Sequence, residues 1–198
     1  ILNTNAFDNH SVDVKTINQK KNGIAMLFLL FAVLVLTVID QWTKRLSALY
    51  LKEQPVVLIE GVFELTYLEN RGAAFGLFKN QRIIFLFITI IVIAIIVFLY
   101  WKVPKNRRFL PMRIVGVGLL SGAVGNMIDR YFHGYVIDFF YFRLIDFPVF
   151  NVADIYVTVS MAALILLWLF YYKEEEFDVI FTKKARSISE EPEDNRYE

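Results

Sequence analysis

Residues 83–101 read IIFLFITIIVIAIIVFLYW, a run in which Thr89 is the only aliphatic polar residue. The hydrocarbon core of a bilayer is about 30 Å thick, and a helix of about 20 mainly apolar residues crosses it. The run therefore predicts a membrane-spanning helix.

Three other stretches share this apolar character. Together with the first they predict four spans, at about 24–42, 83–101, 110–128 and 152–172. The third is the least apolar, because it contains Arg113 and Asn126 and four glycines. Its small residues recur four apart, as in Gly118 and Gly122, which lets helix backbones approach closely in lipid. We expect this span to pack inside a bundle.

The overall composition excludes several other classes of protein. The 198 residues include 21 basic and 20 acidic residues, two histidines and no cysteine, and 57% are hydrophobic. A chain without cysteine has no disulfide scaffold, no thiol nucleophile and no thiolate-ligated metal. The near-zero net charge gives no indication of a nucleic-acid partner.

The distribution of basic residues predicts the orientation of the chain. The connector 102–113 holds five basic residues and no acidic residue, and Lys and Arg are concentrated in cytoplasmic loops. We therefore expect both termini in the cytoplasm. Residues 1–22 read as a flexible polar leader, 23–173 as a single membrane-embedded domain, and 174–198 as a charged, poorly ordered cytoplasmic tail.

Between spans the pattern changes from helical to extended. Residues 56–59 and 62–68 flank the turn Glu60-Gly61, and the second run alternates apolar with polar side chains, which is typical of a β-hairpin. Residues 135–142 form a second, aromatic strand-like run. Both lie on the outer side. The predicted fold is an all-α membrane protein with four transmembrane helices and a small extracytoplasmic sheet.

Polar residues gather at the outer ends of these elements. They are Asp40, Lys44, Asn70, Asn126, Asp129, Arg130, Asp138, Asn151 and Asp154. Ionisable groups at membrane depth are costly and are usually functional. Their convergence on one face predicts a single site.

Some of these residues also fit a purely structural role. Asp40 and Lys44 are four apart, as in an ordinary helical ion pair. Asn151 and Asp154 fit a helix N-cap with a carboxylate in the first turn. Asp138 fits such a role least, because its neighbours in sequence are apolar and aromatic, and an unpaired carboxylate there is desolvated and has a raised pKa.

Two carboxylates in dissimilar surroundings suit general acid–base catalysis. If Asp138 and Asp154 lie close enough to share a proton, one accepts a proton from water while the other donates to the scissile amide. The predicted chemistry is peptide hydrolysis at the outer membrane surface, and it requires no metal, organic cofactor or covalent intermediate.

Other classes of protein also use membrane carboxylates. In a proton-coupled transporter Asp138, Asp154 and Arg130 would form a relay, although transporter charges lie near the midplane rather than at one interface. In a membrane scaffold the outer polar patch would dock a partner. Presenilin-like proteases place their aspartates inside helices, but here Gly116-Val117-Gly118 is followed by Leu119 instead of aspartate.

Five sequence blocks, in this order, resemble the bacterial lipoprotein signal peptidases (signal peptidase II). They are DQWTK at 40–44, NRGAAF at 70–75, GNMIDR at 125–130, GYVIDF at 134–139 and FNVAD at 150–154. The resemblance implies a four-helix enzyme of the bacterial inner membrane with an outer β-cradle, a short helix on the membrane surface and an active site at the outer face.

The resemblance also implies the reaction and the residues. An aspartic endopeptidase of this family removes the signal peptide from prolipoproteins, cutting just before the cysteine that carries diacylglycerol. Asp138 and Asp154 match the catalytic pair. The substrate-binding and supporting positions are Asp40, Lys44, Asn70, Gly122, Asn126, Asp129, Arg130 and Asn151. We expect a monomer that contacts membrane lipids and is inhibited by cyclic peptides such as globomycin.

Overall fold

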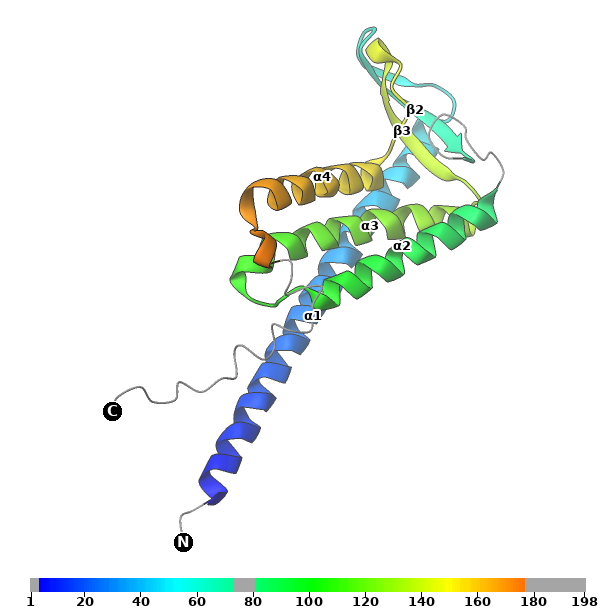
Figure 1. Ribbon diagram of the computed structural model, residues 1–198. Helices are drawn as coiled ribbons and strands as arrows, with labels where there is room; N and C mark the ends of the chain where they lie inside the picture. Colours follow the sequence, from blue (N-terminus) through cyan, green and yellow to red (C-terminus); the bar gives the residue numbers. More distant parts are fainter. Residues whose placement is uncertain (1–3, 73–80, 177–198) are drawn as a thin grey trace.

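A computed structural model describes residues 4–72 and 81–176 of the chain. In chain order the elements are α1 (Thr4–Tyr50), β1 (Val56–Ile59), β2 (Phe63–Asn70), α2 (Arg82–Lys102), the 3₁₀ turn η2 (Arg107–Phe109), α3 (Leu110–Phe132), β3 (Val136–Phe142), the 3₁₀ turn η3 (Arg143–Ile145), α4 (Val152–Leu166) and the π-helical turn η4 (Leu167–Tyr171) (Figure 1).

Within residues 4–72 and 81–176, four segments are long and apolar enough to cross a membrane. They are Met26–Tyr50, Ile83–Lys102, Arg107–Phe132 and Val152–Tyr171. In α2 none of the described side chains is buried, although nearly all are apolar. Large exposed apolar surfaces of this kind are covered by lipid rather than by water. The predicted class, a four-helix membrane protein with a small sheet, is confirmed.

The first helix is longer than the sequence predicted. It runs from Thr4 to Tyr50, whereas a span at about 24–42 and a flexible leader over 1–22 were expected. Residues 4–22 contain neither proline nor glycine, and extending an existing helix avoids the cost of nucleating a new one. The leader is therefore helical from Thr4 onward.

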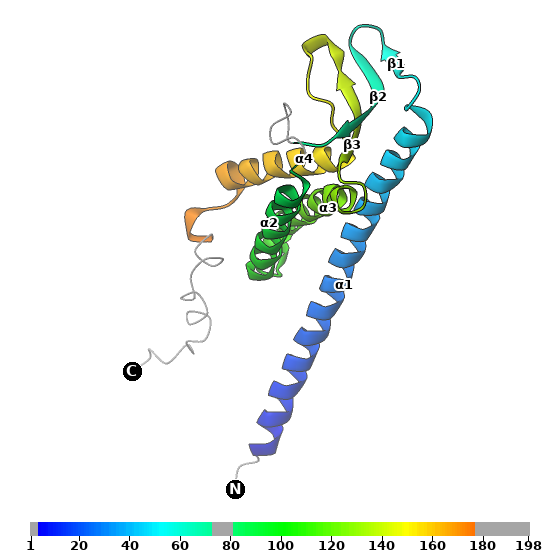
Figure 2. The ribbon, with the colours of Figure 1, turned by 90° about the vertical axis from the view of Figure 1, so that its right-hand side faces the viewer.

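Helix α3 contacts each of the other three membrane helices (Figures 1 and 2). Gly122 shows why it can approach α4 so closely. A Cβ atom at this position would lie 2.5 Å from the carbonyl oxygen of Ala153 and 2.6 Å from Cγ2 of Val157. The small residues of α3 thus bring the two helix backbones together, as the sequence predicted.

The three strands form one antiparallel sheet in the order β1-β2-β3. The predicted turn contains Gly61 with a φ of +70°, a backbone conformation that glycine adopts without strain. The sheet lies where α1 ends and α2 begins, at the end of the bundle opposite the connector between α2 and α3 (Figure 1). In the β2–β3 register Leu68 lies opposite Asp138.

Some predicted features lie outside the described residues. These are the first three residues of the leader, the segment 73–80 with the second half of the NRGAAF block, and the tail beyond 176. Among the elements of 4–72 and 81–176 there is no separate short helix on the membrane surface, the feature that the resemblance implied.

Candidate active site

Strand β3 carries Asp138 into the interior of the site. The four residues from Val136 to Phe139 are buried, and Asp138 is only 1% exposed. The apolar neighbours in sequence suggested an unpaired carboxylate, but in the structure both of its oxygens accept hydrogen bonds. Oδ2 accepts a hydrogen bond from Nδ2 of Asn70 at 2.8 Å, and Oδ1 accepts one from Nδ2 of Asn151 at 2.6 Å.

Burial changes the acidity of this group in the direction that the sequence predicted. Desolvation raises the pKa of Asp138 from 3.8 to about 7, and the nearby charge of Asp154 acts in the same direction. The hydrogen bonds from Asn70 and Asn151 and the charge of Lys44 oppose the shift. Asp138 can therefore hold a proton near neutral pH.

Asp154 lies in the first turn of α4, and its structural role is confirmed. The side chain of Asn151 accepts a hydrogen bond from the Asp154 backbone N–H at 3.0 Å, and Oδ2 of Asp154 accepts one from the Asn151 backbone N–H at 3.1 Å. This reciprocal pair is a capping box. The other oxygen, Oδ1, accepts a hydrogen bond from Nδ2 of Asn126 at 2.8 Å.

Two asparagines connect the carboxylates to each other. Nδ2 of the fully buried Asn151 donates to Asp138 and also lies 3.2 Å from Oδ1 of Asn126, which itself donates to Asp154. One hydrogen-bonded network therefore joins β3, α3 and α4 around Asp138 and Asp154.

Lys44 is the centre of a second, deeper part of this network. It is 1% exposed, and its Nζ lies 2.9 Å from Oδ2 of Asp40, 3.0 Å from Oδ2 of Asp129 and 2.9 Å from Oδ1 of Asn126. The pairing of Asp40 with Lys44 is therefore not an ordinary solvent-exposed helical ion pair. A buried cation with two carboxylates and an amide oxygen is well compensated for its loss of hydration.

The two carboxylates that pair with Lys44 also fix the elements that bear Asp138 and Asp154. Oδ1 of Asp40 accepts a hydrogen bond from the backbone N–H of Ala153 at 2.9 Å, at the start of α4. Oδ2 of Asp129 accepts one from the backbone N–H of Ile137 at 3.1 Å, beside Asp138 in β3. Asp40 and Asp129 thus position the backbone on which Asp154 and Asp138 stand.

Gln41, which was not predicted from the sequence to be a site residue, also belongs to this network. Its Nε2 lies 3.0 Å from Oδ1 of Asp129, 3.1 Å from the carbonyl oxygen of Gly125 and 3.2 Å from Oδ2 of Asp40. Its hydrogen bonds link α1 to α3. Its place beside Asp40 in the DQWTK block was the available signal.

A cavity of about 1090 Å³ adjoins the network. Both Asp138 and Asp154 line it, together with Asn70 and Arg130, and apolar side chains of α4 form part of its wall. Within the described residues Arg130 makes no ion pair with a carboxylate; its guanidinium lies 5.2 Å from the centre of the Phe85 ring. Its Nη1 donates a hydrogen bond to the carbonyl oxygen of Asn126 at 3.5 Å, and its charge acts on Asp154, Asp138 and Asp129 across the cavity wall.

The structure therefore brings together eight of the residues singled out in the sequence. Asp40, Lys44, Asn70, Asn126, Asp129, Asp138, Asn151 and Asp154 belong to one hydrogen-bonded network. Arg130 lines the cavity beside it. Gly122 does not reach the cavity; it contributes through the close packing of α3 on α4.

Comparisons with known proteins show which family the chain resembles. The family model of signal peptidase (SPase) II, Peptidase_A8, matches residues 32–170. The chain is 41% identical over 145 residues to a lipoprotein signal peptidase of Streptococcus thermophilus, covering 73% of this chain and 92% of that protein. A lipoprotein signal peptidase of Fusobacterium nucleatum is 39% identical over 155 residues, covering 77% of this chain and 92% of its own. A solved structure described as a bacterial membrane enzyme superposes with a TM-score of 0.65 and 29% identity, covering 74% of this chain and 92% of its own.

Proposed function

Because this chain belongs to the signal peptidase II family, we propose that it removes signal peptides from prolipoproteins with Asp138 and Asp154 as its catalytic pair. The observation that carries this assignment is the shared position of the two carboxylates. They come from different elements, line the same cavity and are joined through Asn151 and Asn126.

The surroundings of the two carboxylates favour different roles. Asp138, whose pKa burial raises to about 7, holds the proton of the pair. Asp154 lies in the first turn of α4, where the helix dipole favours a negative charge, and this position suits the proton acceptor of the pair. Asp154 takes a proton from water as the water oxygen attacks the scissile carbonyl carbon, and Asp138 donates its proton to the carbonyl oxygen. As the intermediate collapses, the proton on Asp154 passes to the leaving amine, and one hydroxyl of the intermediate returns its proton to Asp138, which restores the starting pair.

The cavity wall suggests how a lipid-modified precursor is held. Its apolar side, which includes Ile155 and Val159 of α4, faces the membrane-embedded part of the substrate, whereas Arg130 and Asn70 lie beside the carboxylates. Arg130 donates hydrogen bonds to carbonyl oxygens of the substrate and fixes the scissile bond. A cyclic peptide such as globomycin competes for this same cavity.

The basic connector supports an orientation for the enzyme. It joins α2 to α3 at the end of the bundle away from the sheet (Figure 1). With this connector in the cytoplasm, both termini are cytoplasmic and the carboxylate pair lies at the outer face of the bacterial inner membrane. Residues 23–173 form one monomeric peptidase domain.

One assay tests the proposed reaction and its substrate. The purified enzyme is incubated with a prolipoprotein and with the same precursor lacking diacylglycerol, and the products are identified by mass spectrometry. We expect cleavage just before the lipidated cysteine and little cleavage of the unmodified precursor. Equal cleavage of both precursors, or a cut at another bond, would contradict the proposal.

A further inference from the structure

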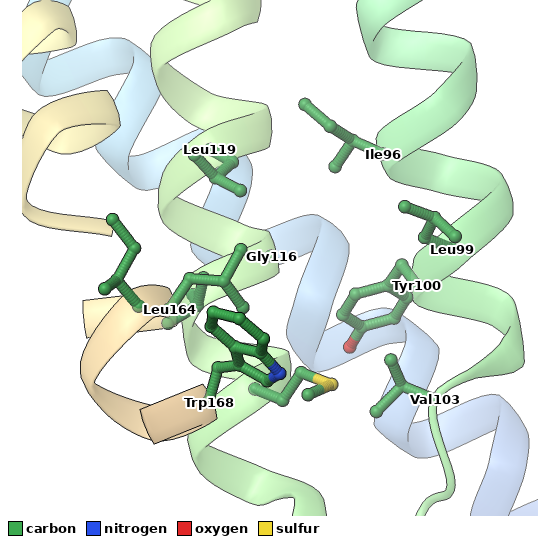
Figure 3. A pocket seen from close by; sticks show the side chains of 11 residues that line it. Ile96, Leu99, Tyr100, Val103, Gly116, Leu119, Leu164 and Trp168 are labelled. Atoms are coloured by element: carbon green, nitrogen blue, oxygen red, sulfur yellow. The ribbon is translucent and has the colours of Figure 1, made fainter. Parts of the chain in front are cut away.

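A second cavity lies between α2, α3 and α4 (Figure 3). It is lined by Leu164 near the C-terminal end of α4, whereas Asp154 lies in the first turn of that helix. The volume of the cavity is about 360 Å³, within the range of small-ligand pockets. Side chains of Ile96, Leu99, Leu119, Leu164 and Trp168 line it, and its wall is almost wholly apolar. All of these residues belong to the segments long and apolar enough to span a membrane, so the cavity lies within the depth of the bilayer.

One basic side chain contacts a residue that lines this cavity, and a second basic residue is next to another lining residue in the chain. Tyr100 lines the cavity, and its hydroxyl accepts a hydrogen bond from Nε of Arg113 at 3.3 Å. Lys102 ends α2 and directly precedes Val103, another lining residue. Neither Arg113 nor Lys102 pairs with a carboxylate of the described chain, whereas the nearby Arg108 pairs with Glu176 at 2.9 Å.

We propose that this cavity binds one acyl chain of an anionic phospholipid whose phosphate contacts Arg113 and Lys102. Arg113 and Lys102 lie 5.8 Å and 4.7 Å from the ring centres of Tyr100 and Phe98, and neither pairs with a carboxylate of the described residues. An apolar cavity beside such cations matches a hydrocarbon chain joined to an anionic headgroup. Basic pockets between membrane helices bind such lipids, and each basic side chain near an anionic membrane surface adds to the attraction. The bound lipid fills the space between α2, α3 and α4 and stabilises their packing.

The charges beside the cavity argue against a signal peptide as its occupant. The n-region that precedes the apolar part of a signal peptide is positively charged. The connector 102–113 carries five basic residues and no acidic residue, so it repels such a segment. The same basic residues attract the anionic headgroup of a lipid.

Native mass spectrometry of the full-length protein in a neutral detergent tests the proposal. The protein is titrated with dioleoylphosphatidylglycerol, with dioleoylphosphatidylcholine of the same chains, and with inorganic phosphate. We expect the anionic lipid to bind more tightly than the zwitterionic one, and free phosphate not to compete. Arg113→Gln weakens binding of phosphatidylglycerol about fivefold.

Matched variants test whether the lipid binds in the cavity or elsewhere on the protein surface. Ile96→Trp fills the cavity and abolishes retention of the lipid, whereas Ile95→Trp, on the lipid-facing side of α2, leaves it unchanged. Arg45→Gln removes an exposed cation at the other end of the bundle and is the control for Arg113→Gln. Leu119→Phe replaces Ile96→Trp if that variant does not fold.

Several results would overturn the proposal. Equal affinity for the two lipids shows that the headgroup is not recognised, and unchanged binding in Arg113→Gln and Ile96→Trp places the lipid elsewhere. If Ile96→Trp raises the KM for the prolipoprotein but leaves retention of phosphatidylglycerol unchanged, the cavity serves the substrate instead. None of these measurements depends on the identity of the catalytic pair.

Discussion

The side-chain amide of Asn151 donates a hydrogen bond to Asp138 over 2.6 Å. The same asparagine caps α4 and exchanges two hydrogen bonds with Asp154. A residue that by itself looks like an ordinary helix cap therefore positions both carboxylates. Capping of the helix and assembly of the site depend on the same side chain.

Replacing Asn151 separates these two roles. Serine is as good an N-cap as asparagine, but it lacks the amide that reaches Asp138. We expect Asn151→Ser to keep most of the stability while lowering the cleavage rate about twofold to tenfold, the value of a hydrogen bond to a neutral, protonated carboxyl. Asn151→Ala should also lose about 0.5 to 2 kcal/mol of stability. Thermal unfolding and kcat measured on both variants check this; a serine variant with full activity would contradict it.

The cleavage rate should decrease as the pH rises above about 7. Burial and the charge of Asp154 raise the pKa of Asp138 to about 7, so at higher pH the pair loses the proton that it shares. A pH profile of kcat/KM on a lipidated precursor tests this expectation. A rate that does not change across neutral pH would be inconsistent with a shared proton.

The stability of the protein provides an independent check on that proton. The folded chain keeps Asp138 protonated up to about pH 7, whereas the unfolded chain loses this proton near the ordinary value of 3.8. Between these values the folded state binds more protons, so the free energy of unfolding decreases as the pH rises. Asp138→Asn should remove this part of the pH dependence; the same slope in both proteins would show that another group is responsible.

Lys44 should be essential for folding of the site. Lys44→Met leaves the buried carboxylates of Asp40 and Asp129 without their cation, and breaking a buried ion pair in this way costs about 3 to 5 kcal/mol. Arg45→Met is the matched control, because Arg45 is exposed and a surface substitution changes stability by about 0.5 kcal/mol or less. Denaturant unfolding in detergent measures both; equal stability of the two variants would argue against the Lys44 network.

The contact between α3 and α4 should not tolerate a larger residue at position 122. In Gly122→Val the added atoms overlap with Ala153 and Val157, and we expect a loss of about 1 to 3 kcal/mol. Gly23→Ala is the control, since nothing lies within 4 Å of a Cβ at that position. A lower melting temperature for Gly122→Val alone is the expected result, and unchanged melting would mean that α3 and α4 are not packed this closely.

The membrane spans and strands were predictable because their signals are local. The length of an apolar run predicts a membrane span, and the alternation of apolar and polar residues next to the turn at Gly61 predicts the hairpin. The start of α1 was not predictable in the same way. Residues 4–22 contain no proline or glycine that would mark where the helix begins. Polar composition alone does not determine whether such a segment continues a helix.

The partners within the site depend on contacts between distant parts of the chain. Asn70 reaches Asp138 because the register of β2 on β3, with its irregularity between Leu65 and Leu68, brings them together. Gln41 meets Asp129 across 88 positions of sequence. The apolar cavity beside Leu119 was also not predictable, because an apolar side chain reads the same whether it faces lipid, a neighbour or an empty space.

Single-turnover cleavage of a lipidated precursor by Asp138→Asn, Asp154→Asn and the double variant tests the catalytic pair most directly. The control is Glu64→Gln, the same chemical change in β2 on a residue that does not line the site cavity. We expect each single variant to be slower by roughly a hundredfold to ten-thousandfold, and the double variant to be no slower than either, because the two groups act as a unit. Substantial cleavage by a folded single variant, or losses that add in the double variant, would contradict the assignment.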